Sequence, residues 1–218
     1  MKKLLIFGSG DLAKIVFFEV MQEKKFNVLG FIDQYKQENL PIIKYKKKKY
    51  KILRLDNIKA KVNGVIAISD NFKRSECYKN TIKKFKKIKW TKIISKNSLI
   101  GKNTFIGEGA IILQNSVINH GSKIGNHCII NTSNSIDHDN VFSDFSSTGP
   151  GVITGGFVKV GRLSFLGIGT KVKHYINIDQ NVLIGGNSFV NKNCKPNIVY
   201  YGNPIKFIRK KKINEKYL

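Results

Sequence analysis

The chain has 218 residues, 41% of them hydrophobic, which excludes a disordered polymer and suffices for one large or two small domains with real cores. Lys and Arg number 39 against 14 Asp and Glu, which gives a formal net charge of +25. This balance indicates nucleic acid, an anionic membrane or anionic small molecules as partners, although a codon bias towards Lys, Asn and Ile would produce the same charge.

Cysteine use and hydropathy indicate a cytoplasmic protein. Cys77, Cys128 and Cys194 lie far apart with no CxxC pair, as expected in a reducing compartment. The apolar run at the start ends after Phe7 and is too short for a signal peptide. No stretch approaches the roughly 20 apolar residues of a membrane span, so we expect none.

The first third of the chain has the pattern of alternating strands and helices. We predict buried strands over residues 3–7, 27–33 and 62–69. Helical spacing follows the first strand up to about Glu23 and recurs over residues 71–87. This order predicts a small βαβ domain around a parallel sheet.

A glycine-rich turn, Gly8-Ser9-Gly10, joins the first strand to the first helix. Its backbone N–H groups and the positive end of the helix suit a phosphate. Asp33, at the end of the second strand, stands where an acid would bind a ribose. Ala13 replaces the third glycine and the domain ends near residue 90, after half a dinucleotide fold, so a dehydrogenase is the weaker interpretation.

Two runs are rich in lysine, KYKKKKYK at residues 44–51 and RKKK at 209–212. Either could bind nucleic acid or an anionic membrane. Apart from Tyr45 and Tyr50, neither has aromatic residues spaced to stack on bases. A solvated charge run is the preferred interpretation, followed by attraction of anionic small substrates, and nucleic acid is not expected as the main partner.

From Ile94 to Val190 an apolar residue recurs at almost every sixth position. Fifteen of these 17 positions are Ile, Leu, Val or Phe, where about six would follow from the 72 such residues among 218. Glycine comes next at eight of them, and a small residue commonly stands four positions after. A period of six fits neither a helix nor a lone strand, and it is typical of a solenoid of short strands and turns.

We expect the sixth residue to face the solenoid axis, the small residue to fill a corner and the glycine to permit the turn. The repeat resembles that of the left-handed parallel β-helix acyltransferases, in which three hexapeptides make an 18-residue coil. The run of about 97 residues would then form a little over five coils that bury one another's edges. The predicted fold is an α/β, half-Rossmann-like βαβ domain followed by a left-handed parallel β-helix of hexapeptide repeats.

The same count places the histidines. His120, His138 and His174 are separated by 18 and 36 residues, so they fall on one edge of the solenoid, two positions after an axial residue. His127 falls elsewhere in the coil. His138 lies in the sequence IDHD, residues 136–139, where an imidazole between carboxylates is either a general base or a surface histidine.

The combination of a small βαβ domain with hexapeptide repeats resembles the bacterial sugar O-acyltransferase family of sialic acid O-acetyltransferases and nucleotide-linked 4-amino-sugar N-acetyltransferases. The similarity covers nearly the whole chain. It includes FGSGDLAK near the start, FIDQ after the second strand, AISDNFKR near residue 70, SIDHDNVFSDFSSTGPGV in the repeats and YYGNPIKFIRK near the end. We expect a nucleotide-sugar domain over 1–90, an acetyl-CoA and catalytic domain over 91–196 and a basic tail over 197–218.

The resemblance implies three groups of site residues. His138 would be the general base, held by Asp139. The nucleotide of the sugar substrate would bind Gly8, Ser9, Gly10, Asp33, Ser69 and Asp70. Acetyl-CoA would bind along Ser147, Gly149, Gly167 and Gly185 and end at Gly202, Asn203 and Pro204.

Ser147 departs from the family pattern, because many members have a second histidine there that contacts the thioester. A hydroxyl can donate to a carbonyl but carries no positive charge. Glycines such as Gly155 and Gly156 would let a backbone N–H approach the oxyanion. Covalent transfer through Cys128 is the competing mechanism, but Cys128 falls at a small inward corner, where packing is the expected role.

The sequence thus predicts a homotrimeric enzyme that moves acetyl from acetyl-CoA to the amino group of a nucleotide-linked 4-amino-4,6-dideoxy sugar, in surface glycan biosynthesis such as O-antigen assembly. No metal is expected, since no ligand cluster is present. O-acetylation of a sialic-acid-like sugar is one alternative. A non-catalytic basic scaffold that uses the repeat only to trimerise is an alternative of another class.

Overall fold

The computed structural model describes residues 1–58 and 61–215. This chain forms two compact units. The first comprises Met1–Ser69 and Lys73–Ile93, and the second comprises Asp70–Phe72 and the chain from Ile94 onward. Among the described residues, no helix combines the length and the hydropathy that crossing a bilayer requires.

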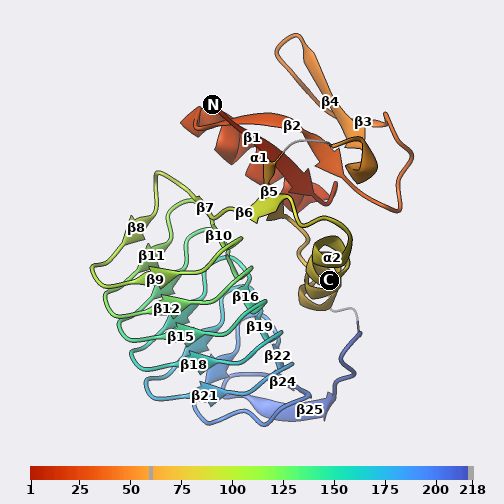
Figure 1. Ribbon diagram of the computed structural model, residues 1–218. Helices are drawn as coiled ribbons and strands as arrows, with labels where there is room; N and C mark the ends of the chain where they lie inside the picture. Colours follow the sequence, from red (N-terminus) through yellow and green to blue (C-terminus); the bar gives the residue numbers. More distant parts are fainter. Residues whose placement is uncertain (59–60, 216–218) are drawn as a thin grey trace. The chain divides into compact units, whose positions relative to one another are not determined.

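The first unit is built on a six-stranded sheet in the order β3-β4-β2-β1-β5-β6 (Figure 1). Its strands are β1 (Lys2–Phe7), β2 (Phe26–Ile32), β3 (Pro41–Tyr45), β4 (Lys48–Leu53), β5 (Val62–Ile66) and β6 (Ile88–Trp90). The helices are α1 (Asp11–Glu23) and α2 (Asn71–Lys84), and a 3-10 turn covers Leu55–Asn57. All neighbouring strands pair in parallel except β3 and β4, so the predicted βαβ domain is confirmed.

The centre of this sheet is β1, whose residues Leu4 to Phe7 are at most 1% exposed. A continuous apolar run suits a parallel strand that is covered on both faces. Helix α1 buries Ala13, Val16, Phe17 and Val20, which recur at helical spacing. The carboxyl ends of β1, β2 and β5 therefore meet at one edge of a well-buried sheet.

Residues 44–51, interpreted from the sequence as a solvated charge run, lie in a hairpin. Strands β3 and β4 pair antiparallel, and β4 also pairs in parallel with β2. The rings of Tyr45 and Tyr50 lie 5.9 and 4.6 Å from the ring of Phe17, between centroids. The sequence pattern does not predict this hairpin, because lysine, which is uncommon in strands, occupies its outward positions.

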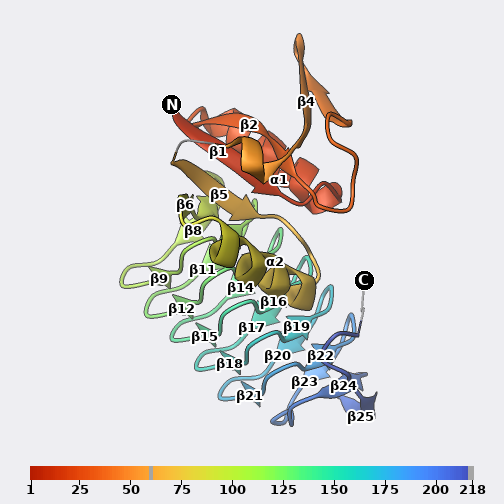
Figure 2. The ribbon, with the colours of Figure 1, turned by 45° about the vertical axis from the view of Figure 1, so that its right-hand side comes forward.

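The solenoid contains 17 two-residue strands in the described part of the chain, stacked into three parallel sheets (Figures 1 and 2). They are β7 (Ile93–Ile94), β8 (Leu99–Ile100), β9 (Phe105–Ile106), β10 (Ile111–Ile112), β11 (Val117–Ile118), β12 (Lys123–Ile124), β13 (Ile129–Ile130), β14 (Ser135–Ile136), β15 (Val141–Phe142), β16 (Ser147–Thr148), β17 (Ile153–Thr154), β18 (Lys159–Val160), β19 (Phe165–Leu166), β20 (Lys171–Val172), β21 (Asn177–Ile178), β22 (Leu183–Ile184) and β23 (Phe189–Val190).

Each strand ends on a residue of the predicted series of six. Neighbours in a sheet are 18 residues apart, as in the pairing of Ile118 with Ile136. From Ile106 to Val190 the axial side chains are at most 7% exposed, whereas Ile100 in the first coil is 38% exposed. The solenoid predicted from the period, and the left-handed parallel β-helix that the resemblance implies, are confirmed.

The glycine after the axial residue does not serve the turn as expected. Positive φ angles occur three positions after the axial residue, at all 15 such positions from Asn103 to Asn187. Gly101 and Gly125 follow an axial residue directly, and a Cβ there would lie 2.5 Å from His120 N and 2.7 Å from Asp144 N of the next coil. These glycines let successive coils approach closely instead.

Polar residues at the inward corners tie each coil to the next. Ser122 Oγ donates to the carbonyl of Asp137 at 2.9 Å, and Asn140 Nδ2 donates to the carbonyl of Gly155 at 2.9 Å. Both corner residues are fully buried, and a buried donor is costly unless it finds an acceptor. These bonds fix the backbone on both sides of His138.

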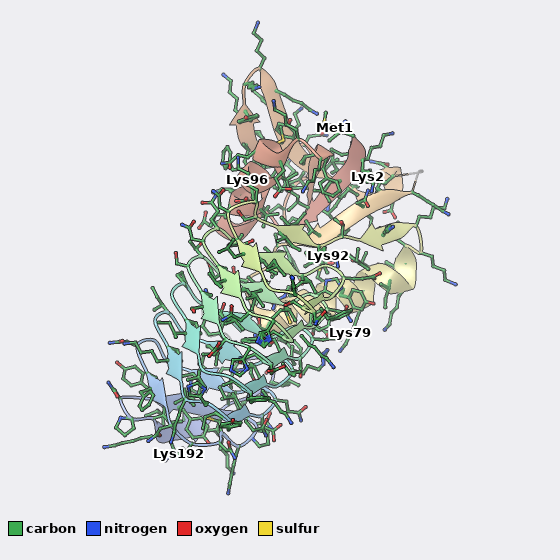
Figure 3. The ribbon with its side chains drawn as sticks, turned by 90° about the vertical axis from the view of Figure 1, so that its left-hand side faces the viewer. Met1, Lys2, Lys79, Lys92, Lys96 and Lys192 are labelled. Carbon is green, nitrogen blue, oxygen red and sulfur yellow. The ribbon has the colours of Figure 1, made fainter. Side chains whose placement is uncertain are left out.

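The chain from residue 197, predicted as a basic tail, includes two further strands. β24 (Ile198–Tyr201) pairs in parallel with β22, and β25 (Lys206–Lys210) pairs antiparallel with β24. Within β25, Arg209 forms a hydrogen-bonded ion pair with Glu215, which lowers the pKa of Glu215 to about 2. Elsewhere, lysine side chains such as Lys96 and Lys192 extend outward from the ribbon (Figure 3).

Candidate functional site

The predicted histidine edge is present in the structure. His120, His138 and His174 follow β11, β14 and β20, which belong to one six-stranded sheet. The rings of His120 and His138 stack with centroids 5.5 Å apart and an interplanar angle of 11°. His127 follows β12 in another sheet and stacks on Phe145, so it lies outside this column.

Asp139 holds the ring of His138. Its Oδ2 lies 2.8 Å from His138 Nδ1, and the His138 and Asp139 side chains are 36% and 38% exposed. A carboxylate at this distance favours the tautomer with the proton on Nδ1. Nε2 is then the ring nitrogen that can take a proton from a substrate.

The backbone of His138 is fixed by neighbours on three sides. Its N–H donates to Asp137 Oδ1 at 2.8 Å, and its carbonyl accepts from Asn140 Nδ2 at 3.1 Å and from the N–H of Phe157 at 3.2 Å. A base that is held in one orientation needs no reorganisation when it acts. The geometry therefore suits His138 to proton transfer.

Two glycines in adjacent coils make room for this pair. A Cβ at Gly156 would lie 2.7 Å from Cε1 and Nε2 of His138. A Cβ at Gly121 would collide with Oδ1 of Asp139, and Gly121 also has a φ of +71°. The His138–Asp139 pair thus occupies space that side chains at these two positions would fill.

His174 contacts the same glycine from the other side. Its Nδ1 accepts a hydrogen bond from the N–H of Gly156 at 2.8 Å. The N–H of Gly155 donates to the carbonyl of Val172 at 2.9 Å. Both N–H groups that were expected to approach an oxyanion therefore have acceptors within the chain.

Two aromatic rings border the histidine column. The ring of Phe157 meets His138 edge-on, with centroids 5.2 Å apart, and stacks on Tyr175 at 5.1 Å. Phe157 is 44% exposed and Tyr175 is 73% exposed. Neither ring was predicted as part of the site, although Phe157 and Tyr175 are 18 residues apart and each directly follows a position of the histidine column.

The carboxylate before His138 stays ionised. Burial alone would raise the pKa of Asp137, but the N–H of His138, the amide of Asn119 and the nearby histidines together lower it. Asn119 Nδ2 donates to Asp137 Oδ1 at 3.1 Å. Asp137 thus holds the backbone N–H of His138, whereas Asp139 contacts its ring.

The predicted acetyl-CoA residues lie along another edge. Gly149, Gly167 and Gly185 follow β16, β19 and β22 in successive coils. A Cβ at Gly149 or Gly167 would lie within 2.7 Å of the next coil, so coil stacking alone accounts for these glycines. Gly202, Asn203 and Pro204 form the turn between β24 and β25, where the Gly202 carbonyl accepts from the N–H of Phe189.

Ser147, also predicted for the donor, is 2% exposed. Its hydroxyl donates to Asn71 Oδ1 at 2.5 Å. Asn71 in turn donates from Nδ2 to the carbonyls of Leu163 and Ser164 at 3.1 and 3.0 Å. This buried network joins the start of α2 to the solenoid within the second unit.

The predicted nucleotide residues of the first unit gather at the carboxyl ends of β1, β2 and β5. Ser9 Oγ donates to Asp33 Oδ2 at 2.5 Å, and the N–H of Tyr35 donates to Asp33 Oδ1 at 3.0 Å. Gly8 needs to be glycine, since its φ is +103° and a Cβ would lie 2.8 Å from the carbonyl of Ala67. At Gly10 a Cβ would meet nothing within 4 Å, so this turn has open space.

Ser69 is exposed directly after this edge, and Asp70 is grouped with the second unit. Arg74, which the sequence analysis did not single out, is 0% exposed and donates from Nη1 to the carbonyls of Ile68 and Ser69 at 2.7 and 2.9 Å. Arg74 lies within the motif AISDNFKR, but only the fold shows that its guanidinium holds this turn.

The cysteines do not offer a nucleophile. Burial raises the pKa of Cys77 to about 11 and that of Cys194 to about 12, so both thiols are protonated at neutral pH. Cys128 is fully buried at an inward corner, and its thiol donates to the carbonyl of Ser143 at 3.1 Å. Within residues 1–58 and 61–215, no three His, Cys, Asp or Glu side chains gather as metal ligands would.

The front of the chain matches a known family. Residues 3–81 match the PglD N-terminal domain. This PglD-like domain contains the Gly8-Ser9-Gly10 turn, Asp33 and Arg74 described above. The predicted resemblance to bacterial sugar acetyltransferases is thereby confirmed for the front of the chain.

Solved structures extend the likeness to the β-helix that follows the PglD-like domain. The acetyltransferase domain of PglB from Neisseria gonorrhoeae FA1090 has a TM-score of 0.85 at 20% identity, with 95% of this chain and 100% of that chain covered. Perosamine N-acetyltransferase from Caulobacter crescentus, as a mutant in complex with CoA and GDP-perosamine, has a TM-score of 0.84 at 22% identity, covering 96% and 98%. WeeI from Acinetobacter baumannii AYE has a TM-score of 0.74 at 19% identity, covering 95% and 100%. These likenesses show a common two-part fold.

Proposed function

We propose that this chain is an acetyl-CoA-dependent sugar N-acetyltransferase with His138 as its general base. The observation that carries the proposal is the His138–Asp139 pair, with 2.8 Å between Nδ1 and Oδ2 on an accessible edge of a β-helix. The fold shared with perosamine N-acetyltransferase and with the PglB acetyltransferase domain, which was solved with acetyl coenzyme A, supports it.

The reaction needs a base of near-neutral pKa. A sugar amine is largely protonated at neutral pH and must lose a proton to attack a carbonyl. The ammonium would first give one proton to solvent, which leaves a neutral amine with a free lone pair. His138 Nε2 would take a second proton from nitrogen as the N–C bond to the acetyl carbon forms, and would give it to the thiolate as the C–S bond breaks. Such a base typically contributes 10²- to 10⁴-fold, and Asp139 would stabilise the imidazolium.

Acetyl-CoA would supply the activated acetyl group and lie along the edge of Gly149, Gly167 and Gly185, ending at Gly202, Asn203 and Pro204. This edge precedes β17 and β20, whereas the histidine column follows β14 and β20, so the two edges border one face of the solenoid. A donor on the glycine edge of one chain could meet His138 of a second chain packed against it. Leu99 and Ile153, outward residues of that face, are 68% and 47% exposed.

We therefore propose a homotrimer of about 74 kDa, three times the 24.7 kDa chain, with the donor between neighbouring solenoids. The sugar nucleotide would bind in the PglD-like domain at Gly8, Ser9, Gly10, Asp33, Ser69 and Asp70. Sedimentation that finds an active monomer would defeat the shared site. The proposed product is the N-acetylated form of a nucleotide-linked 4-amino-4,6-dideoxy sugar used in surface glycan biosynthesis inside the cell.

The test is a thiol-release assay with acetyl-CoA against a panel of UDP-, GDP- and dTDP-linked 4-amino sugars, with a sialic-acid-like sugar as the O-acetylation arm. We expect release with at least one amino sugar, and a loss of roughly 10²-fold or more in kcat for His138→Asn at unchanged acetyl-CoA binding. Near-wild-type turnover by His138→Asn would remove His138 as the base. No release with any acceptor, together with a stable assembly, would favour the non-catalytic scaffold.

A further inference from the structure

We propose that the β3–β4 hairpin is a docking surface for a membrane of anionic lipids. Residues 44–51 contain six lysines. Lys and Arg make up 39 of 218 residues, so about 1.4 would be expected in eight positions. The basic bias of the whole chain therefore does not account for this cluster, and the proposed acetyl transfer does not use it.

The hairpin arranges these charges on one side. Lys44 lies directly opposite Lys49 in the ladder, and Pro41 lies opposite Lys51. Because side chains alternate along a strand, Lys44, Lys49 and Lys51 share one face of the ribbon, and all three are exposed. Lys46 and Lys47 add two exposed charges at the turn.

The opposite face is anchored to the first unit. Tyr50 is 6% exposed and its ring meets Phe17 at 4.6 Å, while Tyr45 lies 6.0 Å from Phe18, between centroids. Ile43 and Ile52 are buried on the same side. The hairpin, which stands out from its sheet in Figure 2, is thus held in place by the packing of one face, and its lysine face points outward.

Nothing within the described chain neutralises this face. None of the six lysines is within ion-pairing distance of a carboxylate among residues 1–58 and 61–215. Like charges directly opposite in a ladder destabilise the pairing. An external anionic surface would relieve the repulsion between Lys44 and Lys49 that the fold leaves in place.

The chemistry of the face favours lipid headgroups over nucleic acid. Between residues 41 and 53 there is no Arg, Asn or Gln to read base edges. Tyr50 is buried and Tyr45 half-buried on the packed side, so neither ring of the hairpin lies on the lysine face to stack on bases. Lysine ammonium groups alone match a plane of anionic headgroups, where attraction depends on the number of charges near the surface.

The test is co-sedimentation of the full chain with vesicles of phosphatidylcholine alone and of phosphatidylcholine mixed with phosphatidylglycerol, at physiological ionic strength. We expect binding only to the mixed vesicles. The triple variant Lys44→Gln, Lys49→Gln, Lys51→Gln should lose about a hundredfold in affinity, since each lysine near an anionic surface contributes about fivefold. The matched control, Lys83→Gln, Lys84→Gln, Lys86→Gln, removes three exposed charges at and just after the end of α2 and should bind like wild type.

A further triple variant, with the same three hairpin lysines changed to arginine, keeps the charge and should retain binding, which separates loss of charge from loss of fold. Equal losses in the hairpin variant and the matched control would overturn the proposal, because general basicity would then explain binding. The absence of binding by wild type would also overturn it. Tighter binding of single-stranded or duplex oligonucleotides than of the mixed vesicles, with the same dependence on the hairpin lysines, would assign the face to nucleic acid instead.

Discussion

The imidazole of His174 accepts the N–H of Gly156 at Nδ1, over 2.8 Å, and Gly156 in turn lies against the ring of His138. A Cβ at Gly155 would lie 2.7 Å from the His174 ring, so the Gly155-Gly156 backbone is a thin spacer between two imidazoles. The bond requires an unprotonated Nδ1 on His174. We therefore expect His174 to act as a positioning residue for the proposed base, which lies two coils away on the other side of Gly156.

His174→Ala should lower kcat by about tenfold with little change in either KM, because the spacer beside His138 loses its anchor. His174→Asn should recover part of the loss, since its Oδ1 can accept a hydrogen bond. Steady-state kinetics of wild type and the two variants measure both changes, and wild-type kinetics in His174→Ala would refute the positioning role.

Gly156→Ala should reduce kcat by at least about tenfold, because the new Cβ would lie 2.7 Å from Cε1 and Nε2 of His138. Gly186→Ala is the comparison variant. Gly186 holds the same place in the repeat on the proposed donor edge, where its Cβ would meet the side chain of Ile168, which is 63% exposed and can move. Its effect should therefore be confined to the KM for acetyl-CoA. We expect both variants to melt near the wild-type temperature, and equal kcat in the two would contradict the idea.

Asp139→Asn should cost less in kcat than His138→Asn, because Asp139 orients the ring and stabilises its charge but takes no proton from substrate. The amide can still occupy the same turn, since asparagine tolerates the φ of 55° found at Asp139. Parallel kinetics of the two variants check the order. A larger loss in Asp139→Asn would mean that Asp139, and not His138, carries the proton.

Ser147→Ala separates two roles for a residue that was expected near the thioester. The hydroxyl is buried and donates to Asn71, so we expect a loss of about 1–2 kcal/mol in the free energy of unfolding. The KM for acetyl-CoA should stay unchanged. Chemical denaturation and steady-state kinetics measure the two effects, and the reverse pattern, normal stability with a raised KM, would restore the role in donor binding.

The ion pair between Arg209 and Glu215 should make the end of the chain sensitive to acid. Hydrogen bonding to Arg209 lowers the pKa of Glu215 to about 2, well below its ordinary range. A carboxyl with a depressed pKa stabilises the fold above its unfolded pKa, and this contribution is lost as pH falls through the folded pKa.

Amide exchange in β24 and β25 should therefore stay slow down to the ordinary carboxyl range and accelerate between there and about pH 2. Glu215→Gln should exchange faster at neutral pH and converge with wild type at the acid end. Glu108→Gln, which removes an exposed acid elsewhere in the solenoid, serves as control. Unchanged exchange in Glu215→Gln at neutral pH would show that the ion pair does not hold these strands.

The period of six made the solenoid and its histidine edge predictable, because the coil repeats after 18 residues and an apolar residue marks almost every axial position. The contact of His174 with Gly156 was also within reach, since these residues are 18 apart. The left-handed turn positions were harder to find. Asn, Gly or Asp at Asn103, Gly109 and Asp139 point to them, but Phe157 and Tyr175 adopt the same φ and obscure the pattern.

Other features depend on contacts between segments that are far apart in the sequence. Ser147 meets Asn71 across 76 positions, and no local pattern foretells that a serine in the repeat will bind the start of a helix. Arg74 looked like one more basic residue until the fold turned its guanidinium inward to the carbonyls of Ile68 and Ser69. The glycines that follow axial residues are evident in the sequence. The physical reason for them is the close approach of the neighbouring coil, which no local pattern shows.

The repeat fixes, for every solenoid residue, the edge on which it lies and the coil to which it belongs along the axis. Six residues move the chain to the next edge, and 18 bring it back one strand spacing, about 4.8 Å, further along the axis. Deleting one hexapeptide between Asp139 and Gly156 would leave every axial side chain in register with the core. The same deletion would turn Gly156 and His174 onto a neighbouring edge and leave His138 on the original edge with only His120 and Asp139. Changes in length could thus preserve the fold while erasing the site, and only insertions or deletions of whole coils would keep the downstream residues on their original edge.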